Sequence, residues 1–124
     1  MKKKDMGPTS RQLKVGENLR KAISLMIQNH SFHDPIIDRT SILITEVKVS
    51  PDLSNASVYI STLGGLHNTP ELISSLNKSC KPLIGPLTRE LKLRRAPRLN
   101  FILDDSFERQ VYIDNLINEA KNNS

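Results

Sequence analysis

"SLNKSCKPLIGPLTRELKLRRAPRLNF" occupies residues 75–101 and contains the feature on which the fold depends. Its ends have ordinary patterns, an amphipathic helix at the start and a strand at the close. Between them, Pro82, Gly85 and Pro86 fall within five positions, although the apolar spacing there would continue a helix. A proline inside a helix removes a hydrogen bond and clashes with the preceding turn. The sequence therefore predicts a break between two helices, formed by Ser79, Cys80, Pro82, Gly85 and Pro86.

Upstream of the break, the sequence predicts a helix and then two strands. Residues 10–29 carry apolar side chains at helical spacing after a capping Thr9 or Ser10. "SILITEVKVS" and "ASVYIST" are typical strands, and the "SPDLSN" turn between them makes them an antiparallel pair. Simple alternation along the first strand places Ile42, Ile44, Glu46 and Lys48 on one face, and Leu43, Thr45, Val47 and Val49 on the other.

The remaining elements complete an α-β-β-α-break-α-β-α order. Residues 30–40 are predicted to be a connector that Asp34-Pro35 biases toward an extended form. Thr69-Pro70-Glu71 begins the helix before the break, and Pro86 is expected to open the helix after it. "RLNFILDD" is the third strand, and Asp105 is expected to cap a last helix that reaches Ala120. Three strands cannot close a barrel, so we expect an α+β domain with its helices on one face of the sheet.

The charge distribution suggests a polyanionic partner. The chain has 124 residues with 18 basic and 13 acidic side chains, a net charge of +5. Residues 1–30 and 71–100 each carry a net +5, whereas residues 31–70 carry −2 and residues 101–124 carry −3. A fold that brings the two basic blocks together would create a positive field that attracts a polyanion. Only five residues are Phe or Tyr and none is Trp, so binding through phosphates and shape is expected rather than stacking on adjacent aromatic rings.

The composition also indicates in which cellular compartment the protein is expected. The single cysteine, Cys80, cannot form an internal disulfide. No apolar run approaches the ~18–20 residues of a membrane span. The basic start is not followed by the apolar stretch of a secretory signal. We therefore expect a cytosolic protein that does not associate with membranes.

Four blocks of the sequence are similar to bacterial ribosome-binding factor A. They are "ITEVKVSPDLSNASVYIS" (residues 44–61), "LNK", "LKLRRAPRLNF" and "DDSFER", and their spacing also fits over roughly residues 10–120. The resemblance implies a type II KH-like domain that has lost the glycine-rich KH loop and has a kink of the form Ala-x-Gly between its central helices. This chain has Ser79-Cys80-Lys81 at that kink.

The same resemblance implies a function without catalysis. Members of this family bind the small (30S) ribosomal subunit and its rRNA during assembly, promote late maturation including processing of the 5′ end of 16S rRNA, and matter most in the cold. We therefore expect an RNA-binding ribosome-biogenesis protein without a cofactor, acting as a monomer. A general KH-like RNA-binding protein with no ribosomal role is the alternative.

Two groups of basic residues are candidates for RNA contact. A helix that restarts at Pro86 would present free N–H groups to a phosphate, with basic side chains before and after it. The first group is Lys78, Lys81, Arg89, Lys92, Arg94, Arg95 and Arg98. The second group lies outside the apolar stripe of the first helix and consists of Arg11, Lys14, Arg20 and Lys21.

Other chemistry has weaker support. His30 and His33 have a metal-like spacing but no nearby ligand to complete a set, so no metal site is predicted. Asp104 and Asp105 could hold magnesium in a nuclease, but such sites need further carboxylates. Ser50-Pro51-Asp52 is explained by a turn, and Cys80 has no evident base, so no catalytic residue is assigned. We expect a flexible basic arm at residues 1–9, one domain at residues 10–120 and a frayed tail at residues 121–124.

Overall fold

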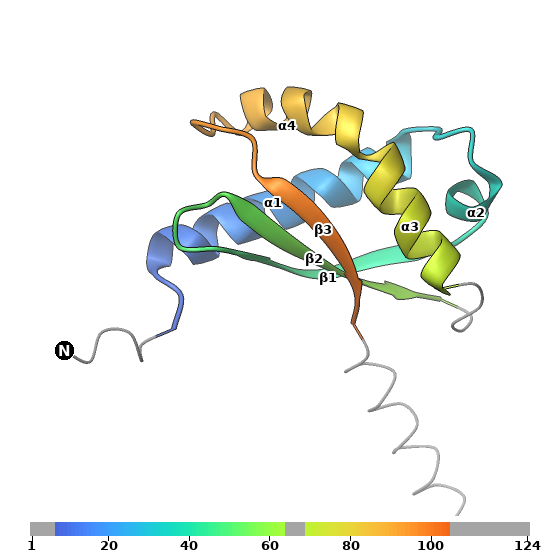
Figure 1. The fold of residues 1–124 in the computed structure, drawn as a ribbon, viewed down its shortest axis with the longest axis horizontal. Helices are drawn as coiled ribbons and strands as arrows, with labels where there is room; N and C mark the ends of the chain where they lie inside the picture. The colour runs from blue at the N-terminus through green and yellow to red at the C-terminus, as the bar shows by residue number, and fades with distance from the viewer. Residues whose placement is uncertain (1–6, 64–68, 105–124) are drawn as a thin grey trace, which may run out of the picture.

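The computed structural model describes residues 7–63 and 69–104, and the elements follow the expected order (Figure 1). The part of the chain before the break contains α1, α2, β1, β2 and α3, which span Ser10–Asn29, Pro35–Asp38, Ile42–Val49, Asn55–Thr62 and Thr69–Ser79. A short 3-10 helix, η2, covers Lys81–Leu83, and α4 and β3 follow at Ile84–Glu90 and Arg98–Leu103. The last helix predicted from the sequence, with its cap at Asp105, lies outside the described residues.

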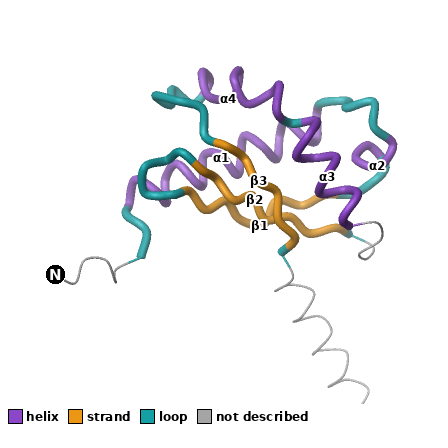
Figure 2. Tube along the Cα trace, viewed as in Figure 1, coloured by secondary structure: helices purple, strands orange, loops and turns teal. Residues whose placement is uncertain are grey.

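The three described strands form one mixed sheet in the order β1-β2-β3 (Figure 2). β1 and β2 are antiparallel, as predicted from their short turn, whereas β2 and β3 are parallel. A parallel pair needs a crossover, and α3 and α4 provide it. The expected α+β class, with helices packed on a three-stranded sheet, is confirmed.

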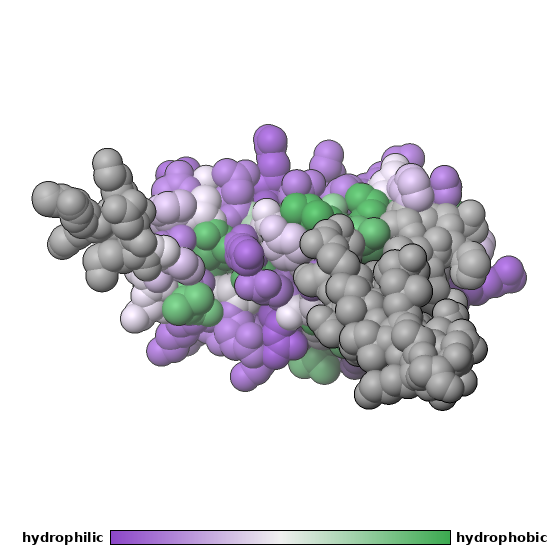
Figure 3. All heavy atoms as spheres, turned by 90° about the horizontal axis from the view of Figure 1, so that it is seen from below, coloured by the Kyte–Doolittle hydropathy of each residue, from purple (hydrophilic) through white to green (hydrophobic). Residues whose placement is uncertain are grey.

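The core lies on one face of the sheet. Val47, Val58 and Phe101 are neighbours across the three strands and all are buried. The helices cover this face with fully buried side chains, which include Leu19, Ile23, Leu72 and Leu76. The next row on the strands, Lys48, Ser57 and Asn100, points to the other face. Seen from the side opposite α3 and α4, the described surface is mostly hydrophilic, with separate apolar patches (Figure 3).

A β-bulge in β1 corrects the predicted faces of this strand. The pairing of β1 with β2 is regular up to Ile44 and resumes at Glu46, so Thr45 is an extra residue. An extra residue reverses the alternation. Ile44 therefore shares the buried face with Val47 and Val49, whereas simple alternation had placed it with Glu46 and Lys48.

Side-chain amides from two helices occupy both edges of the sheet. Gln12 of α1 donates from Nε2 to the Val49 carbonyl oxygen on the β1 edge, at 3.1 Å. Asn77 of α3 accepts through Oδ1 from the Phe101 N–H on the β3 edge, at 3.0 Å. Unpaired backbone groups on an edge strand invite pairing with another chain. These two contacts reduce that exposure and tie each helix to the strand beside it.

The ends of the first helix agree with the prediction, whereas the connector after it differs. Thr9 caps α1 in a reciprocal capping box with Gln12, and the helix ends at Asn29. Asp34 is extended, as a residue before proline should be, but Pro35 then starts the single-turn helix α2. The Asp34 carboxylate caps this turn by accepting from the Ile36 N–H at 3.0 Å, which explains why the connector is not extended throughout.

The helix break lies slightly earlier than predicted. α3 ends at Ser79, Pro82 lies inside η2, and α4 already begins at Ile84. Gly85 and Pro86 are therefore in the first turn of α4, and the expected helix start at Pro86 is wrong. Cys80, Leu83 and Ile84 all have right-handed helical angles, and no residue from Ser79 to Ile84 has a positive φ. The break needs no left-handed residue, so it forms without a glycine at Cys80 or Lys81.

Candidate nucleic-acid interface

Three elements meet at one end of the sheet and enclose a basic groove. β2 and β3 are parallel, with Asn55 opposite Arg98, so the segments that precede these two strands lie side by side. The hydrogen bond from Gln12 to Val49 brings the first turns of α1 to the same end. The groove encloses about 570 Å³ between these segments.

The groove lining combines both basic blocks of the sequence. Arg11 comes from α1, and Lys92, Arg94 and Arg95 come from the connection between α4 and β3. All four are exposed. Asp52 is the acidic residue among the described lining, which gives the lining a net charge of +3. The two basic blocks of the sequence therefore do meet in the fold, because Arg11 of the first block lines the groove together with three cations of the second block.

The turn between β1 and β2 forms one wall, and its hydrogen bonds make it rigid. The Asp52 carboxylate accepts from the Ser54 hydroxyl at 2.7 Å, the Ser50 hydroxyl at 2.8 Å and the Ser54 N–H at 3.1 Å. These bonds, led by that of the Ser54 hydroxyl, lower the pKa of Asp52 to about 2. The expected turn at Ser50-Pro51-Asp52 is confirmed, and the carboxylate serves the turn.

The connection from α4 to β3 forms the opposite wall through a tight helix end. The Leu93 N–H bonds to the Thr88 carbonyl at 3.0 Å, and the Lys92 N–H bonds to the Arg89 carbonyl at 3.1 Å. This pair of bonds defines a Schellman motif, in which the residue at the position of Lys92 is normally glycine. Lys92 has a φ of 57° there. The motif sends the chain sharply back toward β3 and presents Arg94 and Arg95 at the rim.

The basic residues near the helix break are separate from this groove. Lys78, Lys81 and Arg89 are exposed, but none contributes to the groove lining within the described residues. The Ile84 N–H bonds to the Lys81 carbonyl and the Leu83 N–H to the Cys80 carbonyl. Pro82 and Pro86 have no N–H. The backbone donors expected to face a phosphate at the break are therefore largely used or absent.

The remaining basic candidates have different surroundings. Lys14 and Lys21 are exposed on α1, and Lys14 follows Arg11 by nearly one helical turn. Arg20 forms an ion pair with Glu17 at 2.5 Å, and this hydrogen bond lowers the pKa of Glu17. Arg98 begins β3, where strand alternation places its side chain on the face away from the helices. The structure therefore groups Arg11, Lys92, Arg94 and Arg95 and separates the others.

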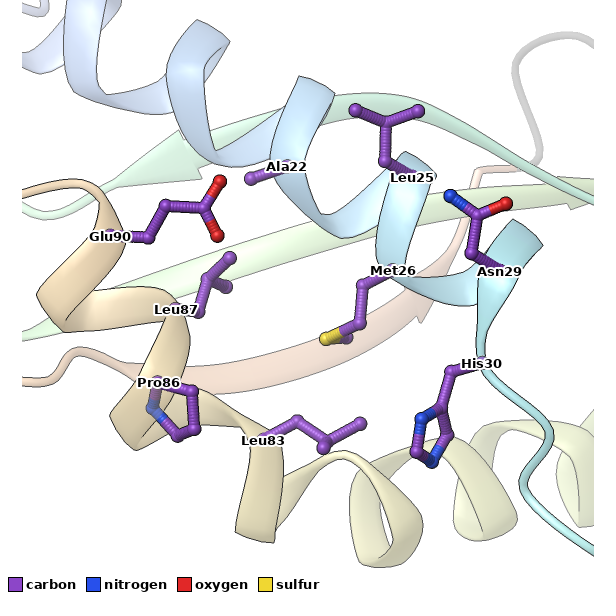
Figure 4. A pocket seen from close by; sticks show the side chains of 9 residues that line it. All are labelled: Ala22, Leu25, Met26, Asn29, His30, Leu83, Pro86, Leu87 and Glu90. Atoms are coloured by element: carbon purple, nitrogen blue, oxygen red, sulfur yellow. The ribbon is translucent and has the colours of Figure 1, made fainter.

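A second groove lies between α1 and α4, and its chemistry differs. It encloses about 380 Å³, and side chains of the two helices face one another across it (Figure 4). Its walls are mainly apolar, with Leu25 and Met26 from α1, Leu83 from η2 and Leu87 from α4. Asn29, His30 and Glu90 supply its polar groups. Without a lysine or arginine among its described lining, this groove does not suit a polyanion.

The weaker chemical alternatives gain no support. The Asp104 carboxylate accepts a hydrogen bond from the Thr45 hydroxyl at 2.5 Å, which links the end of β3 to the bulge in β1. Asp105 lies outside the described residues. His30 packs edge-to-face against Phe32 at 4.7 Å between ring centroids. Within residues 7–63 and 69–104, no three His, Cys, Asp or Glu side chains are placed to hold a metal ion. Over the same ranges, we find no helix with the length and apolarity needed to cross a membrane.

Some groove residues could not be found from the sequence. The local pattern identifies Leu53 only as part of a turn, Val15 and Leu19 only as apolar positions of the first helix, and Leu93 only as an apolar residue near the end of the helix after the break. The available signal was topological, because parallel strands begin at the same end of a sheet, which places residues 50–54 beside residues 92–97. The sequence alone did not specify that β2 and β3 are parallel neighbours.

The β2-α3-α4-β3 crossover, with α1 and β1 added before it, defines a KH-like α+β domain with a basic groove at one end of its sheet. The chain belongs to the ribosome-binding factor A family, whose model matches residues 11–117. It is 37% identical to ribosome-binding factor A of Phenylobacterium zucineum over 115 residues. The aligned region covers 93% of this chain and 79% of that protein.

Solved structures agree with this assignment. The crystal structure of ribosome-binding factor A from Thermus thermophilus matches with a TM-score of 0.62 and 25% identity, covering 74% of this chain and 94% of that one. The Thermus thermophilus model fitted into the cryo-EM map of a 30S–RbfA complex matches with a TM-score of 0.56 and 26% identity, covering 73% and 91% of the two chains.

Proposed function

We propose that this protein is a non-catalytic, monomeric assembly factor of the cytoplasm that binds the small (30S) ribosomal subunit and its rRNA. It promotes late maturation of the subunit, including processing of the 5′ end of 16S rRNA, and its contribution is largest in the cold. Membership of the ribosome-binding factor A family supports the role, and the 30S complex of the Thermus relative supports the partner.

The observation that carries the proposal is the basic groove. Arg11 is more than eighty positions from Lys92, Arg94 and Arg95, yet all four line the same hollow. A cluster of exposed cations in a concave site raises the local potential and attracts phosphates. The arginines present planar donors that suit bidentate contact with phosphate oxygens. These four side chains are therefore the proposed rRNA contacts.

Sedimentation of cell extracts tests the proposal. The parent protein should co-migrate with free small subunits and not with translating ribosomes. Replacing Arg94 and Arg95 with glutamine should weaken this association at least about tenfold per arginine, because each charged hydrogen bond contributes about 1.5–3 kcal/mol. Migration away from small subunits at all salt concentrations would favour the general RNA-binding alternative.

A matched variant tests the location of the site. Lys78→Gln with Lys81→Gln removes the same charge from α3 and η2, which precede α4, whereas Arg94 and Arg95 follow α4, a helix of seven residues that is about 10 Å long. We expect this pair to weaken binding less than the arginine pair. Equal losses would extend the interface to the helix break, and a larger loss from the lysine pair would overturn the groove as the main site. Circular dichroism of both variants checks that the fold is retained.

A further inference from the structure

The basic groove has an apolar floor that phosphate binding alone does not require. Leu53, Leu93 and Pro97 line it together with Val15 and Leu19 of α1. Leu19 and Pro97 are buried, and the other three are half-buried. A surface of exposed cations would suffice for a sugar-phosphate backbone. The hollow of about 570 Å³, which has these apolar side chains beside its charged ones, is instead within the range of ~300–1,000 Å³ that is usual for pockets holding small organic groups.

Two strained residues face this groove from separate elements. Leu53 has a φ of 61° and Lys92 has a φ of 57°, and His33 is the other non-glycine residue with a positive φ in the described chain. This conformation is unfavourable for a bulky side chain, and such strain concentrates where a ligand is held. The Leu53 N–H is fixed by the Ser50 carbonyl at 2.8 Å, inside the turn that Asp52 stabilises. The turn therefore maintains the apolar side chain of Leu53 at the groove.

We propose that the groove holds one unpaired nucleotide of an RNA strand, with its base against Leu53 and Leu93 and its flanking phosphates at Arg11, Arg94 and Arg95. This inference rests on the proposed function and specifies which form of RNA the groove selects. An unpaired base can be splayed out onto apolar side chains or an arginine plane, whereas a base in a duplex is stacked and paired. The apolar floor suits the base and the basic rim suits the phosphates, so the groove fits an unpaired nucleotide better than the backbone of a duplex.

Binding of three RNAs of equal length distinguishes the contribution of the bases from that of the sugar-phosphate backbone. Fluorescence anisotropy with the full chain would compare a single strand, its duplex, and the same strand with abasic residues at its central positions. The abasic strand keeps every phosphate and loses only the bases. We expect the intact strand to bind at least tenfold more tightly than either competitor. Binding of the abasic strand within twofold of the intact strand would overturn the proposal without any protein variant.

Leu53→Asn identifies the residue that contacts the base. Asparagine tolerates the left-handed conformation, so the turn is retained while the apolar contact is lost. The preference for the intact strand over the abasic one should fall toward one. Leu25→Asn changes an exposed leucine on α1, outside the groove, and should leave the preference unchanged. A folded Leu53→Asn variant with the parent preference would contradict the inference.

These experiments distinguish an error in the proposed nucleotide site from an error in the proposed assembly role. A protein that co-migrates with small subunits but shows no preference for bases retains the assembly role and loses only the nucleotide site. A protein that prefers intact single strands but never co-migrates with small subunits keeps the nucleotide site and loses the assembly role.

Discussion

Gly16 of α1 lies directly against the backbone carbonyl oxygen of Val47 in β1, and a Cβ atom at position 16 would be only 2.5 Å from that oxygen. The helix therefore crosses the strand at a distance that only glycine permits. This contact and the hydrogen bond from Gln12 to Val49 fix α1 along β1. The same arrangement holds Arg11 beside the turn between β1 and β2, so the packing of α1 positions one wall of the basic groove.

Gly16→Ala should destabilise the protein. In an ordinary helix interior this change is stabilising by about 1 kcal/mol. Here the methyl group meets backbone, which cannot rotate away, so α1 must shift from β1. We expect a net loss of about 1–3 kcal/mol in the free energy of unfolding, as for other overpacked sites. Urea unfolding followed by circular dichroism measures it.

Asn18→Ala is the control, because Asn18 is an exposed residue of the same helix. It should stabilise by a few tenths of a kcal/mol through helix propensity. If Gly16→Ala were as stable as Asn18→Ala, the close approach of α1 to β1 would be wrong.

Lys92→Gly should increase stability while it weakens RNA binding. Lys92 takes the left-handed position of the Schellman motif at a φ of 57°, which costs a non-glycine residue about 1–2 kcal/mol. Glycine removes that cost, and the loss of the ammonium group removes a cation from the groove. Thermal unfolding and RNA titration measure the two effects separately.

Lys92→Ala separates the charge from the backbone. Alanine removes the same ammonium group but retains the strain, so its RNA affinity should match that of Lys92→Gly while its stability stays near that of the parent. Equal stability of the glycine and alanine variants would show that the left-handed conformation has no cost here.

Cys80 should be unreactive in the folded protein. It is 1% exposed at the helix break, and burial raises the pKa of its thiol to about 11. The folded protein therefore favours the protonated thiol over the thiolate. The part of the free energy of unfolding that depends on this protonated thiol is fully present below the pKa of the unfolded thiol, about 8.5. It is lost as the pH rises from there to about 11.

Two measurements check this prediction. At pH 8, a disulfide reagent should react with the unfolded chain much faster than with the native protein. The stability advantage of the parent over Cys80→Ala should shrink between about pH 9 and 11, because only the parent has a thiol to ionise. Fast native reaction at pH 8 would mean that the helix break opens readily.

The element order was predictable because local signals agreed along most of the chain. Thr9, the apolar spacing of α1 and the β-branched strands each indicate the structure that forms. The face of Ile44 was not predictable, because a bulge at Thr45 depends on pairing with β2 and on the Asp104 carboxylate beyond β3. Nothing near Thr45 in the sequence reveals that distant partner.

The charged residues of the candidate site were predictable from the sequence, but which of them lie together in the fold was not. The basic residues were found because they cluster along the sequence, and Arg94 and Arg95 line the groove. In the sequence, Lys78 and Lys81 are indistinguishable from them because all lie within one short stretch. The rise of α4 separates the two groups, and the turn that contains Leu53 joins the groove only because β3 is parallel to β2.

The salt dependence of small-subunit binding should reflect the cations of the groove. If Arg11, Lys92, Arg94 and Arg95 each neutralise one phosphate, the slope of log K against log salt should be about −2.8 to −3.6, since each phosphate contributes about −0.7 in single strands and −0.9 in duplex. Replacing Arg94 and Arg95 with glutamine should make this slope shallower by about 1.4–1.8. Replacing Lys78 and Lys81 instead should change it less, because those lysines lie outside the groove. A slope that is the same for the parent and the arginine variant would mean that other residues neutralise the phosphates, and the groove would then not be the electrostatic centre of the interface.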